Sequence, residues 1–337
     1  MSGIIALRSP RYISNTAATG ANSSKLTINI DGNLEYTLVK STIGGATMLW
    51  EISQLCRDFI NITFDGTYVA ETLIVVSTIT SHASTDGSGS NLNSYSVTDY
   101  AYDGYGTFME GANSAPPFGS RPTWLVSPDP YGTLNNKYYI YVPNNTSGSV
   151  PYMTANRVLG YATYNTTDLD IQGSPAGKKM NINRIDCTKY GDGHKVTFVN
   201  KYGALQDLWF FLKSVNSTIK KQEQFQRNII SSTGTYSVNQ HTKQDYNTVA
   251  NTSLTLSSGY YPEWCNTWFE QLLLSEQVWV TRSILTNPTG SEVVPVNVKK
   301  NSMIQKTSLN EKLIDYTFEF DMSFDYINNI YSSSFKS

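Results

Sequence analysis

Apolar and polar residues alternate in short segments through the first half of the chain. Leu26, Ile28 and Ile30 are separated by polar residues, which is the period of a strand with one buried face. Residues 31–33, Asp-Gly-Asn, follow at once and favour a tight hairpin turn, because glycine accepts a positive φ without steric cost. Alternation then resumes. The pattern predicts a β-hairpin over residues 25–38 whose apolar face is buried in a core.

Other parts of the first half carry further signals. Residues 69–80 are rich in Val, Ile and Thr and predict one long central strand. Residues 103–111 predict a bulged strand pair, and residues 138–142 a short strand. Residues 53–60 predict one or two helical turns with Ser53 as the N-cap. Short strands at this spacing are typical of a β-sandwich of the immunoglobulin or fibronectin type.

The second half begins with two predicted strands, residues 183–190 and 194–200, which Gly-Asp-Gly joins as a hairpin. Residues 208–212 are an apolar run, which predicts a strand buried on both faces. Residues 231–251 are polar with little alternation, so we expect them not to fold alone and to become ordered against neighbouring subunits. Residues 316–324 alternate cleanly and predict a closing strand.

One helix is predicted in the second half. Pro262 stands where proline is favoured, at the first helical position. Trp264, Trp268 and Leu272 then recur every four residues, and their apolar neighbours widen the series into a stripe. Because such a stripe must be covered, the sequence predicts an amphipathic helix over residues 262–275 that packs on a sheet.

Length and composition set the domain organisation. The chain has 337 residues, which favours two domains, and Gly and Pro gather within residues 166–179. Aromatic residues make up 12% of the chain and favour strands, because they pack well on a pleated surface. We therefore predict a mainly β fold with two β-sandwich-like domains. Residues 1–170 form the immunoglobulin- or fibronectin-like one, and residues 171–337 the one that carries the single helix.

Charge and cysteine content exclude several classes of function. Only 15% of residues are charged and the formal net charge is −2, so no basic stripe for nucleic acid is evident. Cys56, Cys187 and Cys265 are far apart and in no metal-site or disulfide pattern, and we expect reduced, mostly buried thiols. The first residues lack the apolar core of a signal peptide and no run approaches the length of a membrane span, so we expect neither.

The motifs of catalysis and cofactor binding are missing from the sequence, so we predict a protein that is not an enzyme and has no catalytic, cofactor or metal residues. The three histidines, His82, His194 and His241, stand in unrelated contexts, and we expect them at solvent-exposed loop or strand positions. The glycine-rich residues 104–111 lack the helix and the Lys-Ser/Thr of a phosphate-binding loop. We interpret these glycines as permitting a bulge or close strand packing.

Two kinds of carbohydrate chemistry stay open as alternatives. A glycosidase needs two carboxylates across a cleft, and Glu110, Glu263 and Glu319 are candidates only in the sense that any acid is. Tyrosine-rich loops could stack on sugars or anchor protein contacts, since tyrosine offers a large contact area at low entropic cost.

Several pieces of the chain occur in a recognisable order. They are Asn-Lys-Tyr-Gly-Ala at 200–204, the apolar strand at 208–212, polar strands around Arg227 and Tyr246, the helix at 264–275, Val-Trp-Val at 278–280, Val-Pro-Val at 294–296 and the strand at 316–324. With residues 9–13 and 103–108 of the first half, this order resembles proteins encoded in the structural modules of phages and prophages, notably those of Bacteroidetes hosts.

The resemblance implies a virion structural protein of the tail, tail hub or baseplate, with a C-terminal domain similar to tail-tube and hub domains. It implies a homo-oligomeric ring that contacts other tail, neck or fibre proteins. Such a protein is assembled in the host cytoplasm and located in the virion tail. The alternative class is a fibre or receptor-binding protein that binds the host surface or carbohydrate.

Overall fold

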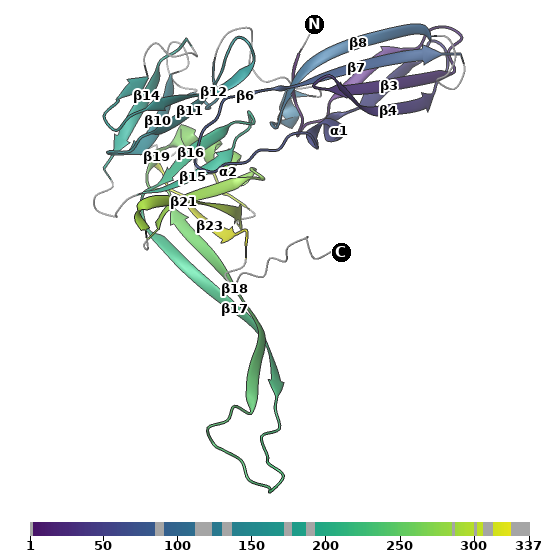
Figure 1. Cartoon of the computed structure of the whole chain (residues 1–337). Coiled ribbons are helices and arrows are strands. Elements are labelled where there is room, and N and C mark those ends of the chain that lie inside the picture. The colour runs from purple at the N-terminus through teal and green to yellow at the C-terminus, as the bar shows by residue number, and fades with distance from the viewer. Residues whose placement is uncertain are drawn as a thin grey trace.

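The computed structural model describes residues 3–84, 91–111, 123–129, 137–171, 177–186, 193–284, 287–299, 302–305 and 313–324. These residues form a mainly β protein, so the predicted fold class is confirmed. Figure 1 shows three parts, which we call the N-terminal domain (residues 3–58 and 74–111), the body (residues 59–73, 123–217 and 253–324) and the arm (residues 218–252).

The N-terminal domain is a two-layer sandwich. The larger layer is a sheet in the order β1 (Ile4–Ala6), β8 (Asn91–Tyr102), β7 (Ile74–Ala83), β3 (Ser23–Ile30) and β4 (Asn33–Ser41). The smaller layer is the pair β2 (Tyr12–Thr16) and β5 (Thr47–Glu51), followed by α1 (Ser53–Arg57). Ile13 and Trp50 of the smaller layer pack with Leu26 and Ile28 of the larger one, and this burial of apolar surface holds the layers together.

Strands β3 and β4 form the predicted hairpin. Asp31 and Gly32 are its turn residues and have φ angles of 48° and 89°, as a type I′ turn requires. Leu26, Ile28 and Ile30 are buried, so the predicted core face is confirmed. β4 is an edge strand of the sheet, and most of its side chains are exposed.

Two predictions for the following residues are wrong. The strand expected over residues 69–80 is interrupted at Leu73, because the chain passes there from the body into the N-terminal domain. Its first part, β6 (Glu71–Thr72), pairs with β12 of the body, and its second part is β7. The N-cap of α1 is Ile52 instead of Ser53, since the backbone N–H and the hydroxyl of Ser53 both donate to the Glu51 carboxylate.

The bulged strand pair expected over residues 103–111 is also wrong. The strand ends at Tyr102, and the short 3₁₀ helix η1 (Phe108–Glu110) follows. Thr107 and Glu110 form a capping box that satisfies backbone donors at its start. The close packing expected of the glycines is present at Gly104, where a Cβ would overlap the Tyr102 ring and the carbonyl oxygen of Lys201. The N-terminal domain and the body meet closely there.

The upper part of the body in Figure 1 consists of two small sheets. One has the order β6, β12 (Val158–Tyr164), β11 (Gly148–Met153) and β9 (Thr123–Trp124), and the other has the order β10 (Tyr138–Pro143), β14 (Met180–Ile185) and β13 (Asp170–Ile171). Residue 170, where we placed the domain boundary, lies in β13. The chain on both sides of that boundary therefore shares one sheet and one hydrophobic core.

The hairpin predicted from residues 183–190 and 194–200 is wrong in its pairing. β14 runs parallel to β10, with Ile140 beside Ile182, and β15 (His194–Val199) pairs instead with β16 and β20. Parallel pairing joins segments that are distant in sequence, so the local turn signal could not indicate it. Residues 187–190 lie outside the described residues.

The lower part of the body is a large sheet that continues into the arm. Its order is β16 (Leu205–Phe210), β15, β20 (Val278–Ile284), β21 (Asn287–Val298), β23 (Thr317–Met322), β18 (Lys243–Ser257) and β17 (Ser214–Gln226). β19 (Tyr261–Pro262) and β22 (Leu313–Ile314) form a separate pair. The strands predicted at 208–212 and 316–324 are β16 and β23. Leu208 and Phe210 are buried although β16 is an edge strand, because β10 and β11 lie against it.

The predicted helix is confirmed on one face of the large sheet. It starts as the 3₁₀ helix η2 (Glu263–Cys265) and continues as α2 (Asn266–Leu273); Pro262 is the N-cap and not, as predicted, the first helical residue. The Phe269 ring stacks on that of Phe318 at 6.1 Å and meets Phe210 edge-on at 6.3 Å. The apolar stripe of the helix thus packs against the sheet as expected.

The opposite face of the large sheet is crossed by residues 59–70, which we call the strap. Trp279 alternates along β20 with core residues that face the helix, so its side chain points to the strap. The Phe64 ring of the strap lies 5.8 Å from that of Trp279. The strap connects the N-terminal domain to β6 and covers the half of the sheet farther from the arm.

Candidate functional site

The arm is the part of the structure that departs most from a compact domain. β18 pairs with β23 only from Ser253 to Ser257, and among the described residues the rest of β18 pairs with β17 alone. The arm therefore stands free of the large sheet for the nine residues of β17 from 218 to 226, about 30 Å at strand spacing. Residues 227–242 connect the strands at its tip. In Figure 1 the arm points away from the body.

One face of the arm carries an apolar stripe. Directly opposed strand residues share a face, and alternate residues along a strand do too. The register places the following residues on the same face: Ile219 and Phe225 of β17, with Val249 and Tyr246 of β18, and Val215 of β17 at the base of the arm. A register shift between Lys221 and Glu223 adds one residue to β18, and the rings of Phe225 and Tyr246 still meet at 5.7 Å.

This stripe is exposed. The exposed fractions are 42% for Val215, 49% for Ile219, 44% for Phe225 and 47% for Tyr246. A single two-stranded hairpin is at best marginally stable in water, and no sheet or helix among the described residues covers the stripe. The stripe is therefore a candidate surface for contact with another protein.

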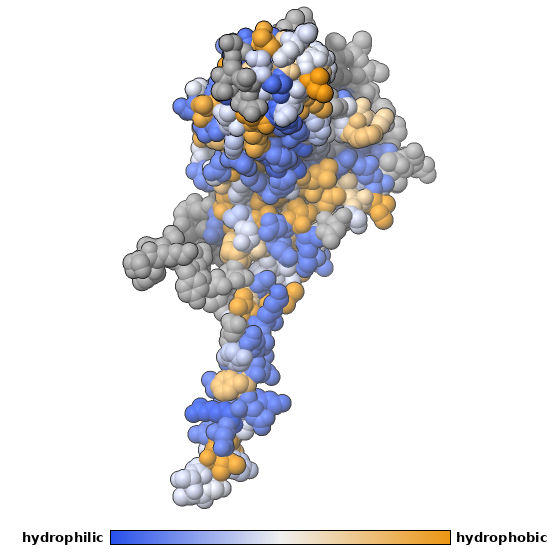
Figure 2. Space-filling view, turned by 90° about the vertical axis from the view of Figure 1, so that its right-hand side faces the viewer, coloured by the Kyte–Doolittle hydropathy of each residue, from blue (hydrophilic) through white to orange (hydrophobic). Residues whose placement is uncertain are grey.

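The other face of the arm is polar and solvated. The Lys220 ammonium and the Gln224 amide each donate to the Asp245 carboxylate at 2.8 Å. These hydrogen bonds, with that of Lys220 the stronger, lower the pKa of Asp245. Figure 2 shows the arm as a narrow column in which hydrophilic surface predominates and hydrophobic spots are separate. The two faces differ in chemistry, so a partner would recognise the arm from one side.

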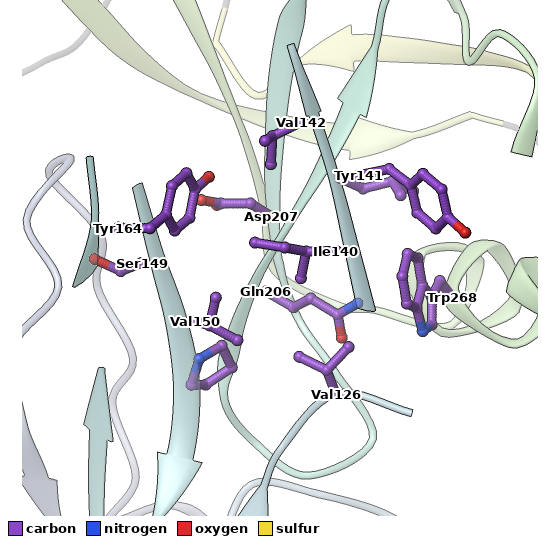
Figure 3. Close-up of a pocket in the computed structure, with 12 residues that line it drawn as sticks. Val126, Ile140, Tyr141, Val142, Ser149, Val150, Tyr164, Gln206, Asp207 and Trp268 are labelled. Atoms are coloured by element: carbon purple, nitrogen blue, oxygen red, sulfur yellow. The ribbon is translucent and has the colours of Figure 1, made fainter. Parts of the chain in front are cut away.

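A cavity of the body lies between β10, β11, β16 and α2 and is too small for a substrate. Its volume is about 20 Å³, close to the room that one water needs. Figure 3 shows Ile140, Val142 and Val150 among its lining side chains, with Tyr164 and Asp207 to one side and Trp268 to the other. A cavity of this size holds neither a sugar nor a cofactor.

Asp207 takes part in a hydrogen-bond network between the large sheet and the strap. It accepts hydrogen bonds from Thr197 at 2.7 Å and from Tyr68 at 2.6 Å, and the Lys195 ammonium lies 3.1 Å from the Tyr68 hydroxyl. Burial, and then the Asp207 charge, raise the pKa of Tyr68 far above its usual range. Tyr68 is therefore a neutral hydrogen-bond donor that holds the strap in place.

The histidines are not brought together. His82 lies in β7 of the N-terminal domain, His194 begins β15 of the body, and His241 is exposed at the arm tip. The expectation of solvent exposure is wrong for His82, which is buried with neither ring nitrogen hydrogen-bonded to a described residue. Burial lowers the pKa of both His82 and His194.

The candidate carboxylates also belong to separate elements. Glu110 of η1 pairs with Lys201 at 2.7 Å, and Glu319 of β23 pairs with Lys299 at 2.7 Å. Glu263 lies in η2, at the start of the helix. The three acids thus lie on three different elements, and the ion partners of Glu110 and Glu319 are lysines, not a second carboxylate.

Cys56 and Cys265 are free and buried, as expected, and Cys187 lies outside the described residues. Burial raises the pKa of Cys56 to about 12 and that of Cys265 well above its usual value, so both thiols stay protonated and unreactive. Among the described parts of the chain no group of three or more His, Cys, Asp or Glu could hold a metal ion. No described helix is long and apolar enough to cross a membrane.

The sequence analysis placed polar strands around Arg227 and Tyr246, but it did not predict that they form a projecting arm. β17 ends at Gln226 and β18 begins at Lys243, although residues 231–251 were expected to become ordered only against neighbouring subunits. The signal that could have found the arm is the spacing of Val215, Ile219 and Phe225, which are separated by even numbers of positions in an otherwise polar segment.

Comparisons of the chain with protein-family models, curated proteins and solved structures found no match.

Proposed function

We propose that this protein is a structural subunit of a phage particle, a tail, tail-hub or baseplate component that assembles into a homo-oligomeric ring. The observation that carries the proposal is the arm, about 30 Å long, which displays an apolar stripe outside any core of its own chain. A closed ring needs the same two complementary surfaces on every subunit, and a projecting arm is one such surface.

Two further observations support a role without catalysis. The described histidines and candidate carboxylates are separate, and the cavity of the body admits about one water. Low charge with abundant Asn, Thr and Tyr suits extensive and hydrated protein contacts. The activity of the protein is then self-assembly and connection to other tail, neck or fibre proteins in the virion.

The second candidate function is a fibre or receptor-binding protein. It is favoured by the exposed aromatic ring of Tyr236, which stands with the exposed Val238 at the arm tip. An exposed tyrosine at the end of a projecting hairpin could stack on a sugar of the host surface.

The experiment that tests the proposal is mass spectrometry of purified phage particles after separation of heads from tails. Abundant peptides of this chain in the tail fraction, at a fixed ratio to the portal protein, are expected for a tail ring. Absence from particles would contradict the structural role. A purified monomer that binds host glycan, and loses this binding on Tyr236→Ala, would favour the second candidate.

A further inference from the structure

Charge is divided unevenly between the arm and the N-terminal part of the chain. The arm, residues 218–252, carries four Lys or Arg and two Asp or Glu. The N-terminal domain, residues 3–58 and 74–111, carries five Lys or Arg and eight Asp or Glu. Opposite net charges steer two surfaces together and suppress contacts between like surfaces. The arm is therefore attracted to an N-terminal domain and repelled by another arm.

The N-terminal domain offers a matching apolar patch at its free sheet edge. Leu34 and Val39 of β4 are exposed by 62% and 54% and pair with Asn29 and Lys25, so they lie on the outer face of the sheet. Ile79 of β7, exposed by 40%, is opposite Thr27 on the same face. We call Leu34, Val39 and Ile79 the acceptor patch. β4 also presents unpaired backbone donors and acceptors along its outer edge.

The arm cannot reach the acceptor patch of its own chain. Figures 1 and 2 are related by a quarter turn about the vertical axis, and in both the N-terminal domain is at the top while the arm extends from the bottom of the body. A contact between the two surfaces must therefore join different molecules. Because the surfaces are different, the contact is heterologous, and repeating it generates a ring if the rotation closes.

We propose that the arm of one copy docks on the N-terminal domain of a second copy, with its apolar stripe against the acceptor patch. This inference rests on the proposed assembly function and specifies the partner and the surface. The stripe and the patch are apolar surfaces of similar character, and each is uncovered among the described residues of its own chain. The net positive charge of the arm and the net negative charge of the N-terminal domain favour this contact over a contact between two arms.

Cross-linking of isotopically mixed protein tests the contact directly. Full-length chains labelled with ¹⁵N are mixed with unlabelled chains, and a carbodiimide joins lysines to carboxylates that touch. Lys221 is the lysine on the stripe face of the arm, so we expect labelled–unlabelled peptide pairs that join Lys221 to Asp31 or Glu35. Pairs that join arm to arm or arm to body, or an absence of mixed pairs, would overturn the inference.

Matched variants of the full chain test the apolar surfaces. The double variant Phe225→Ser and Tyr246→Ser removes two stripe side chains, and Leu34→Ser with Val39→Ser removes most of the acceptor patch. Each is expected to weaken self-association about tenfold or more in analytical ultracentrifugation. The control, Thr218→Ser with Gln224→Ser, changes the polar face of the same arm and should leave association unchanged.

The variants are all at exposed positions, so unchanged thermal melting will show that each chain is folded. Association should also weaken as salt rises, because exposed charges are screened. A loss of association in the stripe variant but not in the patch variant would mean that another surface receives the arm, and would contradict the inference.

The outcome of this test can be distinguished from the outcome of the test of the proposed function. A chain that is absent from phage particles could still give labelled–unlabelled cross-links from arm to N-terminal domain. A chain that is abundant in tails but gives arm-to-arm cross-links would keep its proposed function and lose the inferred contact.

Discussion

The hydroxyl of Tyr68 donates a hydrogen bond to the carboxylate of Asp207, 2.6 Å from each carboxylate oxygen. Tyr68 lies in the strap and Asp207 in β16, and 139 positions of the chain separate them. Thr197 and Lys195 of β15 contact the same two groups. The bond therefore joins the segment between the N-terminal domain and β6 to the large sheet of the body.

We predict that Tyr68→Phe destabilises the protein by about 1–3 kcal/mol, because the Asp207 carboxylate, only 7% exposed, loses the hydrogen bond from the phenol. Equilibrium unfolding in urea measures the change. Tyr260→Phe is the matched control, since Tyr260 is exposed by 65%. Equal midpoints for Tyr68→Phe and the unchanged protein would show that the strap is held by its aromatic contacts alone.

Ile28→Asp is expected to abolish soluble folding of the N-terminal domain. Ile28 is fully buried in the core of the sandwich, and a carboxylate there has no partner. A cost of about 4 kcal/mol or more is comparable with the whole stability of a domain. The fraction of soluble protein and its melting curve check this. Thr37→Asp, on the exposed face of β4, should fold normally.

Stability is expected to fall as pH is lowered from 7 to 5 because of His82. Burial lowers its pKa below the ordinary value near 6.5, so the unfolded chain binds the proton more readily than the folded one. Stability is then fully present above pH 6.5 and is lost below it, at no more than about 1.4 kcal/mol per pH unit. The ring of Tyr95, 6.1 Å away, is its aromatic neighbour.

Melting temperatures across this pH range measure the effect, and His82→Phe should flatten the profile. His194 titrates in the same direction, because burial lowers its pKa too. The variant His194→Gln separates the two contributions. A profile that His82→Phe leaves unchanged would assign the acid sensitivity elsewhere.

Gly104→Ala is predicted to destabilise the protein by about 1–3 kcal/mol, the usual cost of an overfilled contact. The added Cβ would overlap the Tyr102 ring and the carbonyl oxygen of Lys201, and the backbone oxygen cannot move aside cheaply. Small-angle scattering should also report a change in how the N-terminal domain sits on the body. A variant with unchanged stability and shape would contradict the close contact at Gly104.

The sequence predicted those elements whose signals are local. The alternation of Leu26, Ile28 and Ile30 indicates the buried face, and Asp-Gly between the strands indicates the turn. The four-residue spacing of Trp264, Trp268 and Leu272 predicts the helix and the face on which it packs. Each of these patterns lies within one short segment of the sequence, so it can be recognised without knowledge of distant contacts.

The rest depends on contacts that are distant in sequence. Nothing in residues 138–143 indicates that β10 will run parallel to β14, about 40 residues later, and the interruption at Leu73 reflects the route of the chain between two parts. The arm was missed because its stripe is spread over two strands. Phe225 and Tyr246 lie on one face only after the hairpin has formed, with its register shift.

The position of the strap also affects how the protein is made. Phe64 and Tyr68 leave the ribosome well before the strands that receive them, since Trp279 follows Phe64 by roughly 200 residues. At a synthesis rate of about 5–20 residues per second, the interval is roughly 10–40 s. Early in this interval the strap has no strand to cover; β15 and β16 then provide the partners of Tyr68, and Phe64 lacks Trp279 until β20 follows. The nascent chain therefore has a period in which these rings are open to chaperones or to other chains, and it ends when β20 is translated.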